Sequence, residues 1–219
     1  MNRRTLVIST AAAAVAAFGG GAVLVQRGRA ANSAQLPANT PSVDQSRLTP
    51  RHAPVLGPTD APVTLVEFFD PSCEACRAFH PVLQRLRDSY PTQLRLVLRY
   101  TVFHEGSDEA VRILETARMQ DRFEPILDAL LDQQPRWAIH DSPQMDRAWQ
   151  IAAEAGLDLE RAQGDRLFPG ITGVLNQDAT DVEALEIRAT PTFFLNGRRL
   201  ENVSQRSLED AVSQAVAAV

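Results

Sequence analysis

The sequence predicts an α/β domain in which a block of helices separates two groups of strands. Residues 63–69 form an apolar run of strand length, and residues 94–100 alternate apolar and polar side chains as a half-buried strand does. Near the C-terminus, Asn196-Gly197 is a strong hairpin-turn signal between two short strand segments. The sequence between these two regions has helical patterns, so the expected class is mixed rather than all-β.

The helices follow from start and stop signals. A first helix is expected at 77–89, directly after the first strand. Ser107 is the expected N-cap of the next helix, and Ser142 followed by Pro143 indicates a further N-terminus. The remaining helices of the block are expected at 123–131, at a segment that ends at Gly156, in a short segment from Asp158, and at 171–185.

The chain ends with a hairpin and one helix. Strands are expected at 192–195 and 198–200, and Ser207 opens the last helix. Strand, helix, strand, helical block, strand, strand, helix is the order of a thioredoxin fold with an inserted helical domain. We therefore divide the chain into a thioredoxin core at 61–105 and 186–219, a helical insertion at 106–185, a linker at 31–60 and an N-terminal segment at 1–30. The linker is polar and contains five prolines, and we expect it to wrap onto the domain near its end.

The N-terminal segment predicts export. Arg3 and Arg4 precede an apolar stretch from Leu6 to Val25, which is the pattern of a signal peptide, and Ala30 offers a cleavage site. The stretch is long enough to span a bilayer, so an uncleaved signal anchor is an alternative. The two arginines also allow a twin-arginine signal, although an ordinary charged n-region is the preferred interpretation. Either route predicts a periplasmic protein.

The composition excludes a nucleic-acid-binding function. The formal net charge is −5, and removal of the four arginines of residues 1–30 would change it to −9. An acidic domain lacks the basic surface that nucleic acids require. The 189 residues that remain suit one domain with a full-sized core.

The two cysteines of the chain, Cys73 and Cys76, lie two residues apart at the expected start of a helix. A helix N-terminus favours a thiolate over a thiol, so the pair predicts redox chemistry. Three alternatives remain at this point: half of a zinc site, a stapling disulfide, or two ordinary buried thiols. Structural zinc needs four ligands, and a bridge across two residues closes too short a loop to stabilise much.

The segment from Val66 to Cys76, followed by Thr190-Pro191-Thr192-Phe193, resembles the DsbA-like branch of the thioredoxin superfamily. The resemblance covers about residues 55–217. It implies an exported thiol-disulfide oxidoreductase with a thioredoxin core, protein thiols and disulfides as substrates, a membrane redox partner and no organic cofactor. The direction of electron flow and the oligomeric state stay open.

The resemblance also implies roles for individual residues. Cys73 matches the nucleophile and Cys76 the resolving thiol. Glu67 matches a buried carboxylate that relays a proton to or from Cys76, with an exposed strand-edge side chain as the alternative. Pro191 matches a cis-proline that places the Thr190 backbone opposite Cys73 as a binding site for the substrate chain.

Glu74 departs from the best-known members of this branch, which carry a histidine between the cysteines. A carboxylate beside Cys73 is expected to raise the pKa of its thiol and to make the disulfide a weaker oxidant. Replacement of Glu74 by His is accordingly expected to make it more oxidising.

A second function class remains open, namely an exported copper- or zinc-binding or delivery protein. Cys73, Cys76 and His80 would supply three of its ligands, with His104 as a possible fourth. The simpler interpretations are that His80 lies on the surface of its helix and that His104 has a role in a turn.

Overall fold

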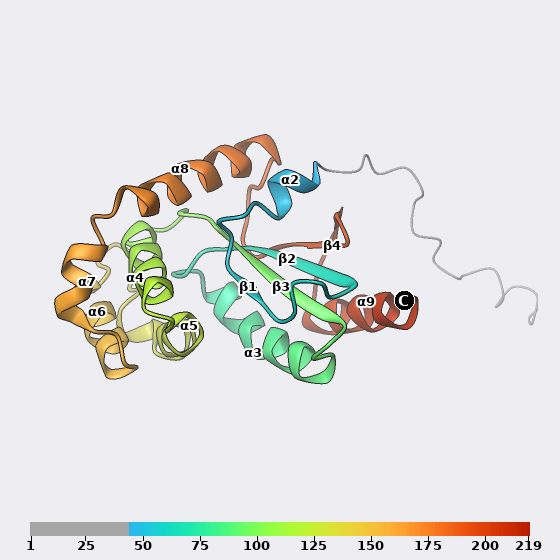
Figure 1. The fold of residues 1–219 in the computed structure, drawn as a ribbon, viewed down its shortest axis with the longest axis horizontal. Helices are drawn as coiled ribbons and strands as arrows, with labels where there is room; N and C mark the ends of the chain where they lie inside the picture. The colour runs from blue at the N-terminus through green and yellow to red at the C-terminus, as the bar shows by residue number, and fades with distance from the viewer. Residues whose placement is uncertain (1–43) are drawn as a thin grey trace, which may run out of the picture. The chain divides into compact units, whose positions relative to one another are not determined.

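The computed structural model describes residues 44–219. A five-stranded sheet in the order β1-β3-β2-β4-β5 forms its centre (Figure 1). β2 and β3 are parallel and pair from Val63–Leu94 to Phe69–Tyr100. β1, β4 and β5 each run antiparallel to their neighbours. The strands are β1 (Val55–Leu56), β2 (Val63–Phe69), β3 (Leu94–Tyr100), β4 (Thr192–Leu195) and β5 (Arg198–Arg199).

The helices follow the predicted order, with one on each side of the helical block. The helix between β2 and β3 is α3 (Glu74–Ser89), and the last element of the chain is α9 (Gln205–Ala217). Between β3 and β4 come α4 (Ser107–Met119), α5 (Phe123–Asp132), the 3-10 turn η1 (Gln134–Arg136), α6 (Met145–Glu154), α7 (Leu159–Asp165) and α8 (Pro169–Ala184). This arrangement confirms the predicted fold class, a thioredoxin fold with a helical insertion.

The two faces of the sheet bury different side chains because successive strand residues point in opposite directions. On one face, the side chains of Leu65 and Phe69 pack against α3 and α9. On the other face, Val66 and Phe68 pack with Leu48 and with residues of α8. Figure 1 shows these helices on the two sides of the sheet. The alternation puts Glu67 on the face that α3 covers.

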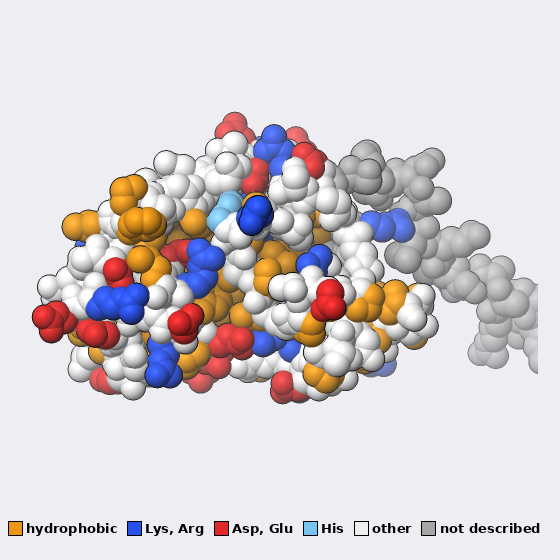
Figure 2. All heavy atoms as spheres, viewed as in Figure 1, with side chains coloured by type: hydrophobic (Ala, Val, Ile, Leu, Met, Phe, Trp, Pro, Cys, Tyr) orange, Lys and Arg blue, Asp and Glu red, His pale blue; other side chains and the backbone are white. Residues whose placement is uncertain are grey.

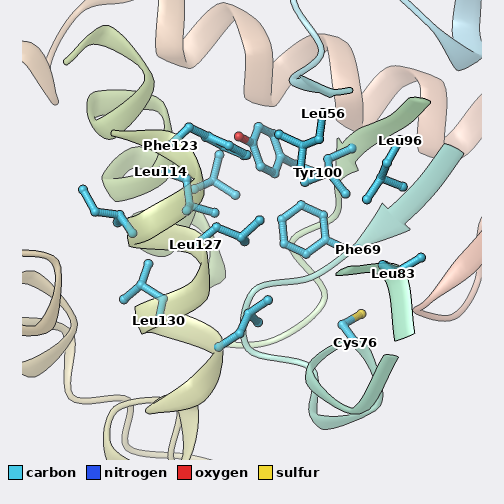
Figure 3. Close-up of a cluster of buried hydrophobic side chains, with 14 of the residues drawn as sticks. Leu56, Phe69, Cys76, Leu83, Leu96, Tyr100, Leu114, Phe123, Leu127 and Leu130 are labelled. Atoms are coloured by element: carbon cyan, nitrogen blue, oxygen red, sulfur yellow. The ribbon is translucent and has the colours of Figure 1, made fainter. Parts of the chain in front are cut away.

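The helical insertion shares a core with the sheet. Figure 3 shows Phe69 and Tyr100 of the two parallel strands beside Leu114, Phe123 and Leu127 of α4 and α5. The rings of Phe69 and Tyr100 lie 5.6 Å apart. Burial of each such side chain contributes about 1.5–3 kcal/mol, so this contact fixes the insertion against the carboxyl ends of β2 and β3.

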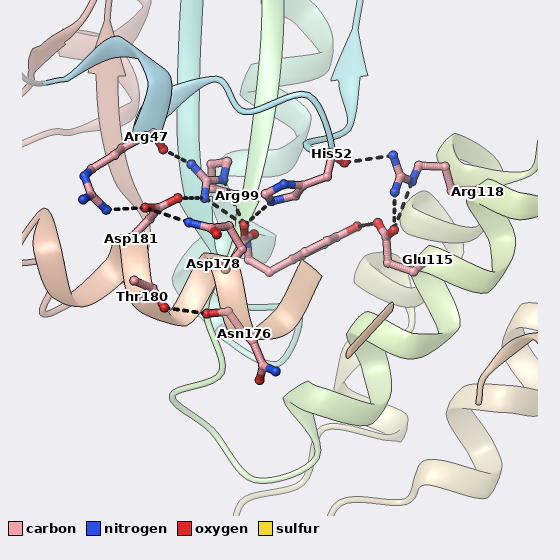
Figure 4. A network of polar contacts seen from close by, with 11 residues as sticks. Arg47, His52, Arg99, Glu115, Arg118, Asn176, Asp178, Thr180 and Asp181 are labelled. Carbon is pink, nitrogen blue, oxygen red and sulfur yellow. Dashed lines mark hydrogen bonds and ion pairs between the residues drawn. The ribbon is translucent and has the colours of Figure 1, made fainter. Parts of the chain in front are cut away.

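A buried network of charges closes the second face of the sheet (Figure 4). Arg99 of β3 is fully buried and donates hydrogen bonds to Asp178 at 2.8 Å and to Asp181 at 2.9 Å, both from α8. Arg47 lies 2.8 Å from Asp181, and His52 lies 2.7 Å from Asp178. A buried charge is tolerated only with such partners, so the network ties the start of the described chain to α8 and β3.

Residues 44–60, which we expected to be linker, belong to the domain. They form α2 (Gln45–Leu48) and the sheet strand β1, and Leu48 is completely buried. These residues have the prolines and polar side chains of a linker, but their few apolar side chains are enough to anchor the segment to the sheet. The predicted signal peptide or anchor and the rest of the predicted linker lie outside the described residues. Within residues 44–219, no helix is long and apolar enough to cross a membrane.

Several helix starts differ from the prediction by a few residues, among them those of α3 at Glu74 and α8 at Pro169. α4 begins at Ser107 with Gly106 as N-cap, because the Ser107 hydroxyl donates to Asp70 instead of capping. α6 begins at Met145 rather than at the Ser142-Pro143 pair. α9 begins earlier than expected, with a capping box between Ser204 and Ser207.

Arginine and acidic side chains are intermixed on the face shown in Figure 2, with apolar side chains exposed between them. Among the described residues, Leu167 and Phe168, between α7 and α8, are the most exposed large apolar side chains apart from the C-terminal Val219. The negative net charge is therefore spread over this face rather than gathered in one region.

We predict that Asp178→Ala lowers the free energy of unfolding by about 3–5 kcal/mol, because it leaves the buried Arg99 without one of its two carboxylate partners. Urea denaturation measures this loss. The matched control is Glu209→Ala, which breaks the exposed ion pair with Arg85 and should cost no more than about 1 kcal/mol. Equal losses in the two variants would contradict a structural role for the network.

Candidate active site at the Cys73–Cys76 pair

The turn that leads from β2 into α3 places the two cysteines. Cys73 is the N-cap of α3, and its backbone N–H donates to the carbonyl of Asp70 at 3.0 Å. Cys76 follows one turn later, inside the helix. The N-terminus of α3 presents unpaired backbone N–H groups and a partial positive charge to the first sulfur atom.

Cys73 is the acidic thiol of the pair. A hydrogen bond from the Cys76 thiol lowers the pKa of Cys73 to about 5; burial opposes this shift, and the Thr190 side chain and the backbone N–H groups of Cys76 and Ala75 support it. Cys73 is 6 % exposed, so only a small part of the residue reaches solvent. At neutral pH its sulfur is a thiolate, the form that attacks disulfides.

Cys76 is the protonated thiol. It is 2 % exposed, and burial raises its pKa far above the ordinary range; the hydrogen bond with Cys73 and the charge of Glu67 act in the same direction. The two sulfur atoms therefore differ in ionisation because one lies at the helix end and the other one turn deeper.

Glu67 lies under Cys76 on β2, opposite Leu98 of β3 and Phe193 of β4 in the register of the sheet. It is 3 % exposed, so the buried interpretation holds rather than the exposed strand edge. Burial, followed by the charge of Cys73, raises the pKa of Glu67 to about 8. The carboxyl group and Cys76 line one small cavity of about 10 Å³.

The peptide bond between Thr190 and Pro191 is cis, as predicted from the sequence. The Thr190 carbonyl oxygen lies 3.5 Å from Cys73 Sγ. A hollow of about 310 Å³ opens beside it, with Ala75 and Phe79 of α3 on one side and Pro191 and Val203 on the other. The structure thus brings Thr190 and Pro191 next to the first cysteine.

Asp70 is a site residue that the sequence analysis missed. Its buried carboxylate accepts hydrogen bonds from the backbone N–H groups of Ser72, Phe103 and His104, from the His104 ring and from the Ser107 hydroxyl. The residue stands at the end of a strand before Pro-Ser-Cys, a position where aspartate commonly bonds the backbone two residues on. The sequence could have indicated the bond from Ser72 to Asp70, but not the bonds of Asp70 with Phe103, His104 and Ser107.

Gln134 is the second missed residue, and it comes from the helical insertion. Its side-chain amide donates to the carbonyl of Pro71 at 2.7 Å and to the carbonyl of Cys73 at 3.1 Å. Both partners belong to the turn that leads from β2 into α3 and carries Cys73. Gln134 is buried, so these bonds are not exchanged for water.

Glu74 has a partner that the sequence did not indicate. His140 Nε2 lies 2.7 Å from a Glu74 carboxylate oxygen, and both side chains are exposed. The backbone N–H of Glu74, followed by His140, lowers the pKa of the Glu74 carboxyl. The pKa of Cys73 is lowered overall by Cys76, Thr190 and the backbone N–H groups, despite the nearby Glu74 carboxylate. That Glu74 makes the disulfide a weaker oxidant than a histidine would stays a prediction.

His104 has the turn role predicted for it. Its backbone N–H and ring both bond to Asp70, and its ring lies edge-on to His140 at 6.2 Å. Partial burial works against its charge, but the hydrogen bond and charge of Asp70 raise its pKa overall, with smaller contributions from Cys73 and Glu74. When His104 is protonated, its charge adds to the partial positive charge of the α3 N-terminus near Cys73.

His80 is buried, not on the helix surface as predicted, and its Nε2 lies 2.7 Å from Asp128 Oδ1 of α5. Among residues 44–219, no group of three or more His, Cys, Asp or Glu side chains is arranged to hold a metal ion. The geometry therefore does not favour the copper- or zinc-binding alternative.

Comparison with known proteins identifies the family. A family model described as Thioredoxin matches residues 49–214. The Na(+)/H(+) antiporter NhaA of Herminiimonas arsenicoxydans is 32% identical over 178 residues, which are 81% of this chain and 28% of that protein. The NhaA 1 antiporter of Mycolicibacterium gilvum is 30% identical, over 69% of this chain and 24% of that protein. The chain thus spans about a quarter of the length of these curated relatives.

Solved structures give a similar result. A thioredoxin-like oxidoreductase from Silicibacter pomeroyi is 34% identical with a TM-score of 0.68, and the match covers 81% of this chain and 100% of that one. BdbD from Bacillus subtilis has a TM-score of 0.66 at 21% identity, with coverages of 75% and 93%. Alpha-DsbA1 from Wolbachia pipientis has a TM-score of 0.69 at 16% identity, with coverages of 78% and 94%. With the fold and the paired cysteines, the family match places the chain in the thioredoxin superfamily.

Proposed function

We propose that the protein is an exported thiol-disulfide oxidoreductase that exchanges a Cys73–Cys76 disulfide with protein substrates. The observation that carries the proposal is the difference between the two thiols. Cys73 has a lowered pKa at the start of α3 and faces the Thr190 carbonyl, whereas Cys76 has a raised pKa one turn deeper. An acidic outer thiol and a protonated inner thiol are what disulfide exchange requires.

The oxidised protein would react in two steps. A substrate thiolate attacks Cys73, the Cys73–Cys76 bond breaks, and its electron pair remains on Cys76, which takes a proton from Glu67. A second substrate thiolate then attacks the substrate sulfur of the mixed disulfide and releases the Cys73 thiolate. The substrate loses two electrons and the protein gains them; the reverse sequence reduces a substrate disulfide.

Three features support Glu67 as the proton donor and acceptor. It is buried on the sheet face that α3 covers, it lines the same cavity as Cys76, and its pKa is raised to about 8. A group with a pKa near the working pH exchanges protons well in both directions.

The substrate chain would bind beside Thr190 and Pro191. An extended peptide can add to exposed backbone as a short strand, with side chains in neighbouring hollows. The Thr190 carbonyl beside Cys73 and the hollow between α3 and Val203 provide both parts.

Export to the periplasm, with the signal cleaved or kept as an anchor, is supported by the sequence of residues 1–30 alone. Electrons must come from or go to another redox protein, and we propose a membrane protein for this role. We do not extend the ion exchange of the antiporter relatives to this chain, because it matches only about a quarter of their length.

We predict that Cys73→Ser abolishes both the reduction of insulin and the oxidation of a reduced peptide, because it removes the attacking sulfur. Cys76→Ser should instead accumulate a mixed disulfide with the substrate, since the resolving thiol is missing. Non-reducing electrophoresis detects that adduct. Retained turnover in Cys73→Ser would overturn the proposed function.

We predict that Glu67→Gln stabilises the reduced protein by up to about 4 kcal/mol at pH 8, but hardly at pH 4. The folded protein keeps on Glu67 a proton that the unfolded chain releases above about pH 4.5, so the wild-type carboxyl increasingly favours unfolding until about pH 8. Urea denaturation of both proteins at several pH values measures the difference. A difference that does not change with pH would contradict the raised pKa.

We predict that His140→Ala raises the pKa of the Cys73 thiol by about half a pH unit or less, because it leaves the Glu74 carboxylate unpaired at an exposed position. The ultraviolet absorbance of the thiolate, followed against pH, gives the midpoint. The control is the double variant Glu74→Gln/His140→Ala, in which the increase should disappear. The same increase in both variants would show that Glu74 is not its source.

A further inference from the structure

A cavity of about 10 Å³ lies beneath the cysteine pair, between β2, α3 and α5, and is large enough for one water molecule. Its buried end is lined by Glu67 and Cys76, and its other end by the half-buried side chains of Gln84 and Arg87. His80 lines it as well. The other lining residues are leucines and Phe69, several of which appear around Cys76 in Figure 3.

Glu67 has little direct access to solvent, because it is 3 % exposed and lines the cavity beside Cys76. Each turnover nevertheless changes the protonation of the buried thiol above it, so a proton has to cross this layer of the protein. The cavity is the space through which it can do so.

His80 and Asp128 connect the cavity with solvent. His80 lies one turn after Cys76 on α3, and its side chain is 11% exposed. Its Nε2 lies 2.7 Å from Asp128 Oδ1, and the Asp128 side chain is 44% exposed. Gln84 donates to the same oxygen at 3.0 Å and holds the carboxylate in place. With Asp128 as the acceptor, Nε2 carries the proton of a neutral imidazole, and Nδ1 has the lone pair that can accept another.

We propose that His80 and Asp128 relay the proton between solvent and Glu67 during disulfide exchange. An imidazole can take up a proton on one nitrogen while it gives one from the other, which suits it to pass protons from a buried cavity to an exposed carboxylate. This inference rests on the proposed function, because it needs Glu67 to act on Cys76.

The proton balance follows from the exchange step. When the disulfide is reduced, the electron pair stays on Cys76, and Glu67 gives Cys76 a proton and becomes a carboxylate. His80 in its Nδ1–H form then gives that proton to Glu67, while its Nε2 takes one from solvent by way of Asp128. When the dithiol is oxidised, His80 in its Nε2–H form accepts a proton from Glu67 on Nδ1 and releases the Nε2 proton by way of Asp128, which restores the Nδ1–H form. No further oxidant or reductant is needed besides the substrate.

Few other charged groups face His80. β2 contributes Glu67, α3 contributes Cys76 and Arg87, and α5 contributes Asp128 and Glu124. Arg87 and Glu124 pair with each other at 2.8 Å at the outer end of the cavity. The pH dependence of the exchange rate should therefore contain a contribution from Glu67 besides that of Cys73.

The test compares His80→Ala and Asp128→Asn with the wild type in the full chain. The readout is the rate at which oxidised protein is reduced by glutathione and the rate of the reverse reaction, between pH 5.5 and 9. We expect His80→Ala to slow both directions by about tenfold or more, with a larger solvent deuterium isotope effect, and added imidazole to restore the rate. Asp128→Asn keeps the shape of its side chain and should slow both directions less.

The matched control is Arg85→Gln, on the same helix but paired with the exposed Glu209, which should exchange at the wild-type rate. A structural effect of His80→Ala would not be reversed by imidazole, so a slow variant without rescue overturns the relay. Rates in His80→Ala and Asp128→Asn equal to wild type overturn it too, while the proposed function stands. If the wild type exchanges no disulfides, both proposals fail.

Discussion

The buried carboxylate of Asp70 is the interaction on which the arrangement of the site depends. It lies between the end of β2 and the starts of α3 and α4, and it accepts hydrogen bonds from three segments that would otherwise meet without a common partner. An uncompensated carboxylate at this depth would be very costly, so the surrounding N–H and O–H groups are held as firmly as the carboxylate itself. The position of Cys73 at the helix end follows from this.

Depth then determines the chemistry. Helix α3 runs into the core from the turn that Asp70 holds. Cys73 therefore lies at the partly exposed end of the helix, and Cys76, three residues later, lies in the interior. The sheet beneath presents a carboxyl group to the same place, where burial keeps it protonated. The buried Glu67 carboxyl lowers the stability of the fold. A buried acid that lowers stability is typical of a functional group rather than of a core side chain.

The sequence predicts the parts of the structure that depend on neighbouring residues. Strands β2 to β5, the order of the elements from β2 onward, the face on which Glu67 lies and the cis bond before Pro191 all follow from local patterns or from the resemblance they carry. The partners of the charged side chains do not: Asp128 is 48 residues from His80, and His140 is 66 residues from Glu74. Such pairs depend on how the helical insertion packs. Residues 44–60 have the composition of a linker, so the sequence does not show which of their few apolar side chains, such as that of Leu48, are buried in the domain.

The hydrogen bonds from Gln134 to the carbonyls of Pro71 and Cys73 bear on whether the helical insertion can be removed from the thioredoxin core. Through these bonds the helical insertion holds part of the turn that carries Cys73. The apolar cluster around Phe69 also continues into the insertion without a break. Excising it to leave a minimal thioredoxin would strip two acceptors of their donor and open one side of the cluster to water. The inserted helices are therefore part of the site around Cys73 and Cys76. The chain from β1 to α9 is expected to unfold in a single cooperative transition.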